Sequence, residues 1–207
     1  MGYRPRASTE QKRHDILLAA SEVFGKKGTS NATLEEIAEK VGMTRAGLLH
    51  HFGSKKALLL EVIKFRDTND LEELEHKRMP EGAELFRHLI DTVRLNVSRP
   101  SIVRTFITLS SESVTDDNPG REYFAKRYDD LRSEIEDALI ALAKEKKATI
   151  NIAQAEQASC AIIGLMDGLQ LQWLLEPNKV DLIKSTEYGI RTIVASVLSV
   201  PNDDDLF

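Results

Sequence analysis

Apolar residues recur every three or four positions along most of the chain, and this spacing constrains the fold more than any other feature. A period of this length is typical of an amphipathic helix, whereas a half-buried strand would alternate every second residue. The clearest example is a long helix expected over roughly 120–147. Its inward face would carry Phe124, Tyr128, Leu131, Ile135, Ala138 and Leu142. No convincing strand pair or internal repeat is found, so an all-α fold is predicted.

Glycine, proline and capping residues divide this pattern into nine expected helices. The first would span about 9–27 and end at Gly28, as helices often do at a glycine. Thr33, Thr44 and Ser54 would begin the next three, and the fourth helix would run to about residue 77. The remaining five are expected near 85–100, 102–109, 120–147 and 152–176, and after Pro177. The helix near 152–176 is apolar on most sides, so we expect it to be covered on more than one face.

The composition excludes several classes of protein. With 42% hydrophobic and 29% charged residues in 207 positions, the chain can bury a substantial core. Cys160 is the single cysteine, so no intrachain disulfide is possible, and no Cys/His cluster indicates a metal. The first residues lack the apolar core of a signal peptide, and no apolar run approaches the ~20 residues of a membrane span. We therefore expect a cytoplasmic protein without a membrane segment, metal or cofactor.

Charge is distributed unevenly along the chain. Residues 1–65 hold 11 Lys and Arg against 7 Asp and Glu, a net of +4, whereas the whole chain has a net charge of -5. A basic head on an acidic body suggests an anionic partner for the head alone. The alternative is ordinary variation in charge between segments.

The stretch 35–52, "EEIAEKVGMTRAGLLHHF", has the arrangement of a helix-turn-helix. Ala38 is small where a second helix must cross closely, Gly42 suits the turn between them, and Leu48 points back to the core. DNA would meet the first residues of the second helix in its major groove. Those residues are Thr44, Arg45, Ala46 and Gly47, of which Arg45 can reach guanine or a phosphate. A generic helical hairpin with a glycine at its turn is the alternative.

Further polar residues follow the predicted recognition helix. His50 and His51 diverge by about 100° on a helix, so they do not suit one metal site. We expect one ring to contact a phosphate while the other packs or forms a hydrogen bond. Lys55 and Lys56 follow the Ser54 cap, where a helix N-terminus already favours phosphate. A solvated lysine pair is the alternative interpretation.

Residues 12–65 resemble the N-terminal domain of the tetracycline-repressor (TetR) family of bacterial transcriptional regulators. The resemblance lies in "ILLAASEVFGKKG" and "TLEEIAEKVGMTRAGLLHHFGSKKALL". It implies nine helices, of which three bind double-stranded operator DNA and the rest form a dimerising, ligand-binding body. It further implies that Thr33 and Thr44 contact phosphates, Arg45 faces bases, His50 lies at the groove wall and Lys55 meets the backbone. One departure is Leu49, where family members often carry an aromatic residue.

The resemblance suggests domains of 1–53 for DNA binding and 54–201 for ligand binding and dimerisation, with a disordered acidic tail at 202–207. The stretch "DGLQLQWLLEP" is similar to the betaine-regulator type of C-terminal domain. In that family the last two helices form a four-helix bundle with those of a partner, so a homodimer is expected. Candidate residues for an effector pocket are Phe86, Phe106, Met166, Gln170 and Trp173, although such clusters are often plain core.

Three functional hypotheses follow from these observations. The first is a homodimeric repressor that a small-molecule effector releases from its operator. The second is a DNA-binding regulator without a small-molecule pocket, controlled by another protein or acting as an activator. The third is an enzyme, which the sequence disfavours because it has no glycine-rich phosphate loop and no His close to Cys160.

Overall fold

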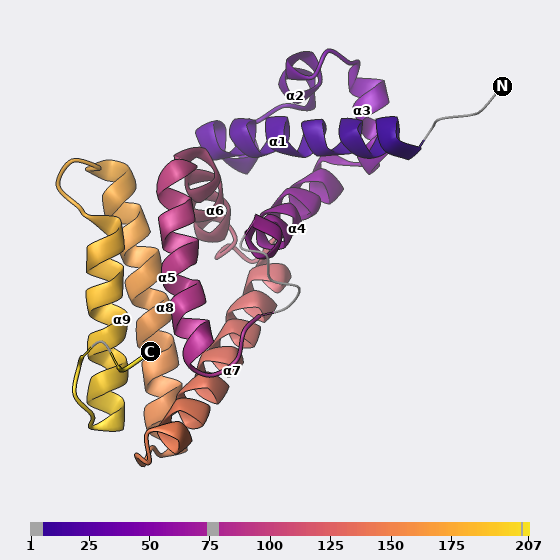
Figure 1. Ribbon diagram of the computed structural model, residues 1–207. Helices are drawn as coiled ribbons and strands as arrows, with labels where there is room; N and C mark the ends of the chain where they lie inside the picture. The colour runs from indigo at the N-terminus through magenta and orange to yellow at the C-terminus, as the bar shows by residue number, and fades with distance from the viewer. Residues whose placement is uncertain (1–5, 74–78, 204) are drawn as a thin grey trace. The chain divides into compact units, whose positions relative to one another are not determined.

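The computed structural model describes residues 6–73, 79–203 and 205–207, and its helices follow the apolar pattern (Figure 1). Within these residues the chain forms nine α-helices and no strand, which confirms the predicted all-α fold. The helices are α1 (Arg6–Asn31), α2 (Leu34–Lys40), α3 (Arg45–Phe52), α4 (Lys55–Glu73), α5 (Ala83–Ser98), α6 (Pro100–Glu112), α7 (Arg121–Glu145), α8 (Ile152–Leu175) and α9 (Leu182–Leu198). The end expected for the fourth helix, near residue 77, lies outside the described residues.

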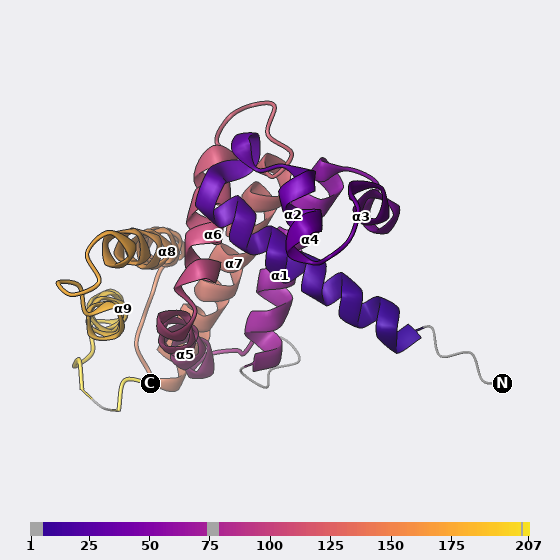
Figure 2. The same ribbon diagram turned by 90° about the horizontal axis from the view of Figure 1, so that it is seen from above.

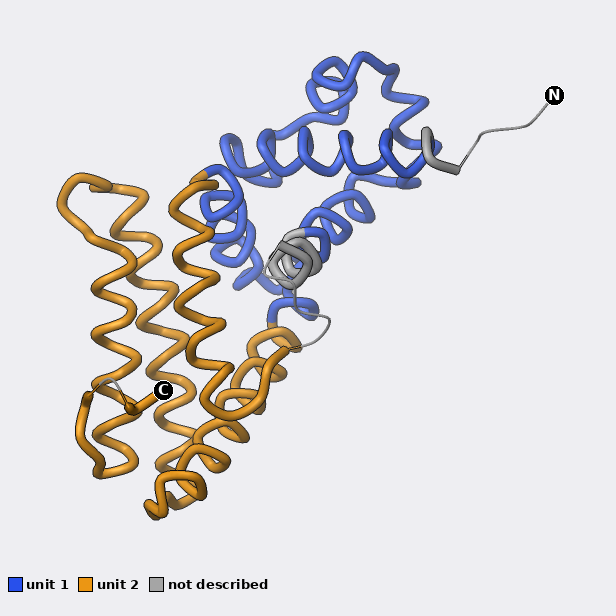
Figure 3. Tube along the Cα trace, in the orientation of Figure 1, with its two compact units in different colours: residues 1–69, 101–124 blue, residues 70–100, 125–207 orange. Residues whose placement is uncertain are grey.

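Two compact units divide the chain, and each combines segments that are distant in sequence (Figure 3). Unit 1 comprises residues 1–69 and 101–124 and so contains α1–α3 and most of α4 and α6. Unit 2 comprises residues 70–100 and 125–207 and contains α5, α8, α9 and most of α7. This division differs from the boundary expected after residue 53, because most of α4 and of α6 packs with the N-terminal helices.

Contacts between α1 and α6 explain why α6 belongs to unit 1. The Thr105 hydroxyl donates to the Ser21 carbonyl over 2.7 Å, and Gly25 lies so close that a Cβ atom there would be 2.3 Å from Thr105 Oγ1. The helical conformation of α1 breaks at Gly28, where the first helix was expected to end. Gly28 has a φ of 73°, and a short helical turn then continues to Asn31. The Glu112 carboxylate of α6 accepts from the Thr29 amide over 2.8 Å and so satisfies a backbone donor freed by the break.

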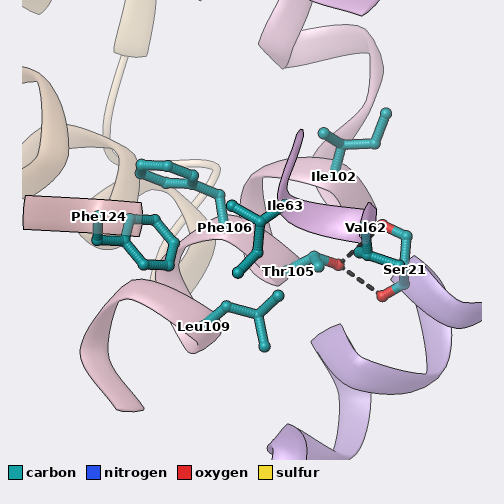
Figure 4. Close-up of a pocket in the computed structure, with 8 residues that line it drawn as sticks. All are labelled: Ser21, Val62, Ile63, Ile102, Thr105, Phe106, Leu109 and Phe124. Atoms are coloured by element: carbon teal, nitrogen blue, oxygen red, sulfur yellow. Dashed lines mark hydrogen bonds between the residues drawn. The ribbon is translucent and has the colours of Figure 1, made fainter. Parts of the chain in front are cut away.

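A small apolar cavity lies inside unit 1 between these helices (Figure 4). It has room for roughly one water molecule. Its lining residues are Ser21, Val62, Ile63, Ile102, Thr105, Phe106, Leu109 and Phe124. Of the residues predicted to line an effector pocket, Phe106 alone is among them.

Unit 2 is a bundle in which α8 and α9 run antiparallel side by side and α5 packs against α9 (Figures 1 and 2). Gly189 permits the close approach of α9 to α8, because a Cβ atom there would be 2.3 Å from a Leu165 methyl group. Arg94 of α5 approaches Glu187 of α9 with an Nη2–Oε2 distance of 3.6 Å. These two contacts define the register of the three helices.

Helix α8 is the most apolar helix of unit 2. Its length and mean hydropathy of 1.3 are those of a membrane-crossing segment, yet 39% of that stretch is already buried inside the structure. We expected α8 to be covered on more than one face, but within the single chain only one side of it is buried. The other side exposes Glu156 together with several small and apolar residues: Ala153, Cys160, Ala161, Gly164, Leu171 and Leu175. Exposed apolar stripes are typical of interaction surfaces.

The C-terminal segment, which was expected to be a disordered tail, packs against unit 2 in this structure. Leu206 is 2% exposed and Phe207 is 6% exposed. The ring of Phe207 lies against that of Phe86, with 5.2 Å between the centroids, and the Arg191 guanidinium lies 4.7 Å from its centroid. Two large apolar side chains at the end of an otherwise acidic segment are the physical reason for this docking.

The docked tail is close to energetic balance. Burial of a Leu or Phe side chain contributes roughly 1.5–3 kcal/mol. Ordering the backbone costs about 1–2 kcal/mol for each residue. These two contributions are of similar size over so short a segment, so the contacts from Arg191 and Lys146 matter for docking.

Candidate nucleic-acid interface

Helices α2 and α3 are short, and both begin with a threonine that caps the first turn. The Thr33 hydroxyl oxygen accepts from the Glu36 amide over 3.2 Å, and the Glu36 carboxylate accepts from the Thr33 amide, forming a capping box. Thr44 Oγ1 accepts from the Gly47 amide over 3.1 Å. Since each oxygen is used as an acceptor, each hydroxyl hydrogen is left for another partner. The predicted caps are therefore present.

The turn between α2 and α3 depends on Gly42 and on a contact from α1. Gly42 has a φ of 64°, which is the left-handed conformation expected for it. The Met43 amide donates to the Ala38 carbonyl over 2.9 Å, and the Lys12 ammonium group donates to the Val41 carbonyl over 2.7 Å. Ala38 is 2% exposed, in agreement with the close helix crossing predicted there.

The surface of α3 separates into a buried side and an exposed leading end. Leu48 and Phe52 are buried, whereas Thr44, Arg45 and Ala46 are exposed. Gly47 is only partly exposed, and a Cβ atom there would be 3.2 Å from Met43 Cε. Gly47 therefore relieves crowding against the turn, in addition to any role at the surface.

An ion pair holds Arg45 in this structure. Its Nε atom lies 3.1 Å from Glu35 Oε1, and the two side chains are 59% and 64% exposed. Exposed pairs of this kind contribute at most about 1 kcal/mol. An incoming phosphate or base edge can therefore replace Glu35 as the partner of Arg45.

The C-terminal end of α3 is attached to α1 through Arg13. This side chain donates to the His51 carbonyl over 3.3 Å and to Glu61 of α4 over 2.6 Å. Its guanidinium also lies 4.4 Å from the centroid of the Phe52 ring. No sequence signal pointed to Arg13, because its partners lie 38 and 48 positions further along the chain.

The two histidines have different surroundings. His50 is exposed, whereas His51 is partly buried with its ring centroid 6.4 Å from that of Phe52. Their own ring centroids are 6.1 Å apart and the planes are inclined at 70°. His50 is therefore the histidine that a ligand from solvent can reach. The different surroundings of the two rings agree with their expected divergence around the helix.

Two lysines lie at the start of α4, close to the exposed Gly53. Ser54 caps this helix by accepting from the Ala57 amide over 3.0 Å. Lys55 is partly exposed and Lys56 is exposed, and neither forms an ion pair within the described part of the chain. A free helix N-terminus with unpaired ammonium groups is a favourable place for a phosphate.

Other cations of unit 1 are engaged with carboxylates that join α1 to α2. Hydrogen bonds from the Lys26 and Lys40 side chains lower the pKa of Glu22 to about 2. Lys27 and then the Thr33 amide lower the pKa of Glu36. These lysines hold the first helix of the motif in place, so they are not equivalent to Lys55 and Lys56.

The five residues predicted to line an effector pocket are not brought into one unit. Phe106 lies in unit 1, and the other four lie in unit 2. Phe86 is fully buried and covered by Phe207, while Met166 and Trp173 are each 8% exposed on α8. Gln170 is 4% exposed, and its Oε1 atom has no hydrogen-bond partner within the described residues.

Gln170 belongs to a group of buried polar side chains that sequence reasoning missed. Thr92 Oγ1, Asn96 Nδ2 and Thr186 Oγ1 are also buried and without a hydrogen-bond partner among the described residues. Thr92 and Asn96 lie on α5 on either side of Arg94, and Thr186 precedes Glu187, the α9 residue that Arg94 approaches. Gln170 lies on α8. Buried polar groups of this kind normally bind water or a ligand.

A sequence signal for this polar group exists in α5. His88, Thr92 and Asn96 follow one another at intervals of four in a helix that is otherwise apolar on its inner side. Side chains four apart share one face of a helix. A polar stripe on a buried face predicts hydrogen-bonding partners inside the bundle.

Comparison with known proteins agrees with this geometry. Residues 16–62 match the family model for bacterial regulatory proteins of the tetR family, and residues 82–198 match that for the C-terminal part of BetI-type transcriptional repressors. The chain is 27% identical to the HTH-type transcriptional repressor BepR of Brucella suis, over 96% of this chain and 98% of that one. It is 28% identical to the HTH-type transcriptional regulator TtgR of Pseudomonas putida, with 91% and 92% covered.

Solved structures with the same fold include SmeT in complex with triclosan, which has a TM-score of 0.76 at 20% identity and covers 95% of this chain and 94% of its own. NalD, described as the secondary repressor of a multidrug efflux pump in Pseudomonas aeruginosa, has a TM-score of 0.70 at 23% identity, with 92% and 97% covered. The relatives matched along most of the chain are transcriptional regulators rather than enzymes, so the enzyme hypothesis is set aside. The chain belongs to the TetR family of bacterial transcriptional regulators and has a C-terminal region of the BetI type.

Proposed function

We propose that this regulator is a homodimeric repressor in the cytoplasm, whose two α3 helices bind the major groove of an operator and which a small-molecule effector releases. The observation that carries the DNA-binding part is the exposed, capped start of α3, held from behind by Lys12 and Arg13 of α1. A short helix held in this way can enter a groove without a further ordering penalty.

Each predicted contact residue has a role in this proposal. Arg45 exchanges Glu35 for a base edge, because guanine offers two acceptors to a guanidinium. The hydroxyl groups of Thr33 and Thr44 donate to phosphates, while Ala46 and Gly47 let the helix approach closely. His50 contacts the wall of the groove. Lys55 contacts the DNA backbone, and His51 supports Phe52.

A second copy of the chain is the proposed partner of the exposed side of α8. The largely apolar stripe from Ala153 to Leu175 can pair with the same stripe of a second copy, and α9 adds the exposed side chains of Tyr188, Thr192 and Ser196. Pairing of α8 and α9 with the same helices of a partner would form a four-helix bundle. Two recognition helices about 34 Å apart would then match half-sites one helical turn apart. A second copy, rather than a membrane, would thereby cover the apolar stripe.

An effector is proposed to bind inside unit 2 near Gln170, Met166 and Trp173, with Thr92, Asn96 and Thr186 as further hydrogen-bonding groups. The buried polar atoms without partners support this proposal. The solved relative SmeT holds triclosan, and a transcriptional regulator from Saccharomonospora viridis holds choline. An effector that binds better to the DNA-free conformation would lower operator affinity by the ratio of its affinities for the two conformations.

Regulation without a small molecule is the second candidate. The cavity in unit 1 that Phe106 lines has room for roughly one water molecule. A cavity of this size favours regulation without a small molecule in unit 1. The chain also matches a transcriptional activator, FasR of Mycolicibacterium smegmatis, with 39% identity over 28% of the chain. Activation of transcription is therefore part of this second candidate function.

Replacing Arg45 by Ala is expected to weaken operator binding by about 1–3 kcal/mol and to relax preference at one base pair. Replacing Lys55 by Ala should weaken binding to all DNA and reduce the slope of log affinity against log salt by about 0.9. Fluorescence anisotropy with operator and random duplexes over a salt series measures both effects. Equal loss by Arg45→Ala on the two duplexes would make Arg45 a phosphate contact, and an unchanged slope would remove Lys55 from the interface.

Replacing Glu35 by Gln is expected to raise DNA affinity roughly two- to fivefold, because the variant frees Arg45 from its ion pair. Glu39→Gln is the matched control, since Glu39 is also exposed on α2 and has no ion-pair partner within the described residues. The same titrations compare the two variants. Identical gains from both would show that only the general negative charge of α2 matters.

Replacing Gly164 by Arg should convert a dimer into a monomer at micromolar concentration. The position is exposed, and a Cβ atom there meets nothing within 4 Å, so the single chain should remain folded. Ala125→Arg makes a comparable change on an exposed part of α7 and should leave the dimer intact. Sedimentation velocity distinguishes the two, and wild-type protein that sediments as a monomer would contradict the proposed interface.

An effector should raise the melting temperature of the free protein and release it from the operator. At one hundred times its dissociation constant, a ligand stabilises the folded state by about 2.7 kcal/mol, which corresponds to several degrees for a chain of this size. Triclosan and choline are the first probes, followed by a small-molecule library. Gln170→Met should reduce the shift for a ligand that uses this amide. A library without a hit would support the alternative without a small molecule.

A further inference from the structure

Residues 205–207 occupy a built site on unit 2. Leu206 and Phe207 are almost fully buried, and the chain end marked in Figure 1 lies beside α9. The Phe207 ring packs against the fully buried ring of Phe86 on α5 and beneath the Arg191 guanidinium of α9. Contacts from two helices therefore define a slot for one aromatic ring.

Arg191 recognises the backbone as well as the ring of this segment. Its Nη2 atom donates to the Phe207 carbonyl oxygen over 3.2 Å, and its Nη1 atom donates to the Asp203 carbonyl over 3.0 Å. Its side chain is only 20% exposed, and Nε lies 3.5 Å from Glu187, which orients the guanidinium. The Lys146 ammonium group of the chain after α7 donates to the Asp205 carbonyl.

The contacts that hold this segment come from a few side chains. The hydrogen bonds reach the segment from long charged side chains, and the two buried side chains roughly offset the entropy of ordering the segment. Asp203 and Asp205 face solvent, so the acidic part of the segment gains little from docking. A molecule that supplies the same ring and acceptor oxygen can therefore take the place of this segment.

We propose that Leu206 and Phe207 are the resident, exchangeable occupant of a ligand site formed by Phe86 and Arg191. When the segment is released, the site takes an aromatic molecule that carries an acceptor oxygen close to its ring, such as an aryl amide. This ligand class follows from the contacts of the site. The aromatic ring of the ligand would pack on Phe86, and its π-electrons would face the Arg191 guanidinium. Its oxygen would accept a hydrogen bond from Arg191 Nη2. The segment lowers the apparent affinity of such a molecule by the fraction of time that it is docked.

This site goes beyond the proposed control of DNA binding, and it differs from the effector site near Gln170. It lies in unit 2, and the experiment below contains no DNA. Its failure and the failure of the DNA-binding proposal are therefore distinguishable.

The test uses the full chain with Leu206→Ala and Phe207→Ala combined, which empties the site. The probe is a fluorescein-labelled peptide of residues 201–207 with an amidated C-terminus, and anisotropy measures its binding. We expect saturable binding to the variant that is at least tenfold tighter than binding to the wild-type chain, whose own segment competes. A control peptide with Ala at both positions should not bind either protein.

Two further measurements define the chemistry. N-acetylphenylalaninamide should displace the labelled peptide from the variant, whereas N-acetylalaninamide should not, because it lacks the ring. Adding Arg191→Met should weaken peptide binding at least fivefold, and Arg191→Lys should restore only part of it, since an ammonium group lacks the planar fork. Circular dichroism checks that each variant is folded, and Phe207→Ala alone replaces the double variant if that one is not.

Equal binding of the peptide to wild-type and variant chains would overturn the proposal, as would no binding to a folded variant. Displacement by N-acetylalaninamide as effectively as by the aromatic probe would also overturn it, because the ring would then not be recognised.

Discussion

The contact between α1 and the end of α3 is the interaction on which the candidate interface depends. Arg13 joins the His51 carbonyl, the Phe52 ring and the Glu61 carboxylate, so one side chain connects α1, α3 and α4. A helix of eight residues is not stable in water by itself. Its exposed face can consist of small and polar residues because packing against α1 and α4, rather than helix propensity, supplies its stability.

A second consequence of this arrangement concerns charge. Unit 1 contains more cations than a DNA contact would need, but Glu22, Glu36 and Glu61 engage Lys26, Lys40, Lys27 and Arg13. These pairs attach α1 to α2 and α4. Part of the basic character of residues 1–65 is thereby used inside unit 1, whereas Arg45, Lys55 and Lys56 lie at the starts of α3 and α4. Position, rather than net charge, distinguishes the candidate contact residues.

Unit 2 combines two features that a stable monomer would avoid. Its helix α8 exposes a largely apolar stripe. Its interior holds polar atoms of Thr92, Asn96, Gln170 and Thr186 that have no hydrogen-bond partner among the residues that the structure describes. Each lowers the stability of an isolated chain. Both become favourable if a second copy covers the stripe and a ligand or water meets the polar atoms, which is why we assign association and ligand binding to this unit.

The sequence by itself determined the helical fold, the caps at Thr33 and Thr44, the turn at Gly42 and the exposed start of α3. These are local properties: apolar period, capping chemistry and backbone conformation act over a few residues. Only the tertiary structure decided the rest. It showed Arg45 paired with Glu35, placed Phe106 and Phe86 in different units, grouped α6 with the N-terminal helices and docked Phe207 on Phe86. Those outcomes join residues far apart along the chain, and the apolar pattern specifies that a face is buried but not which surface covers it.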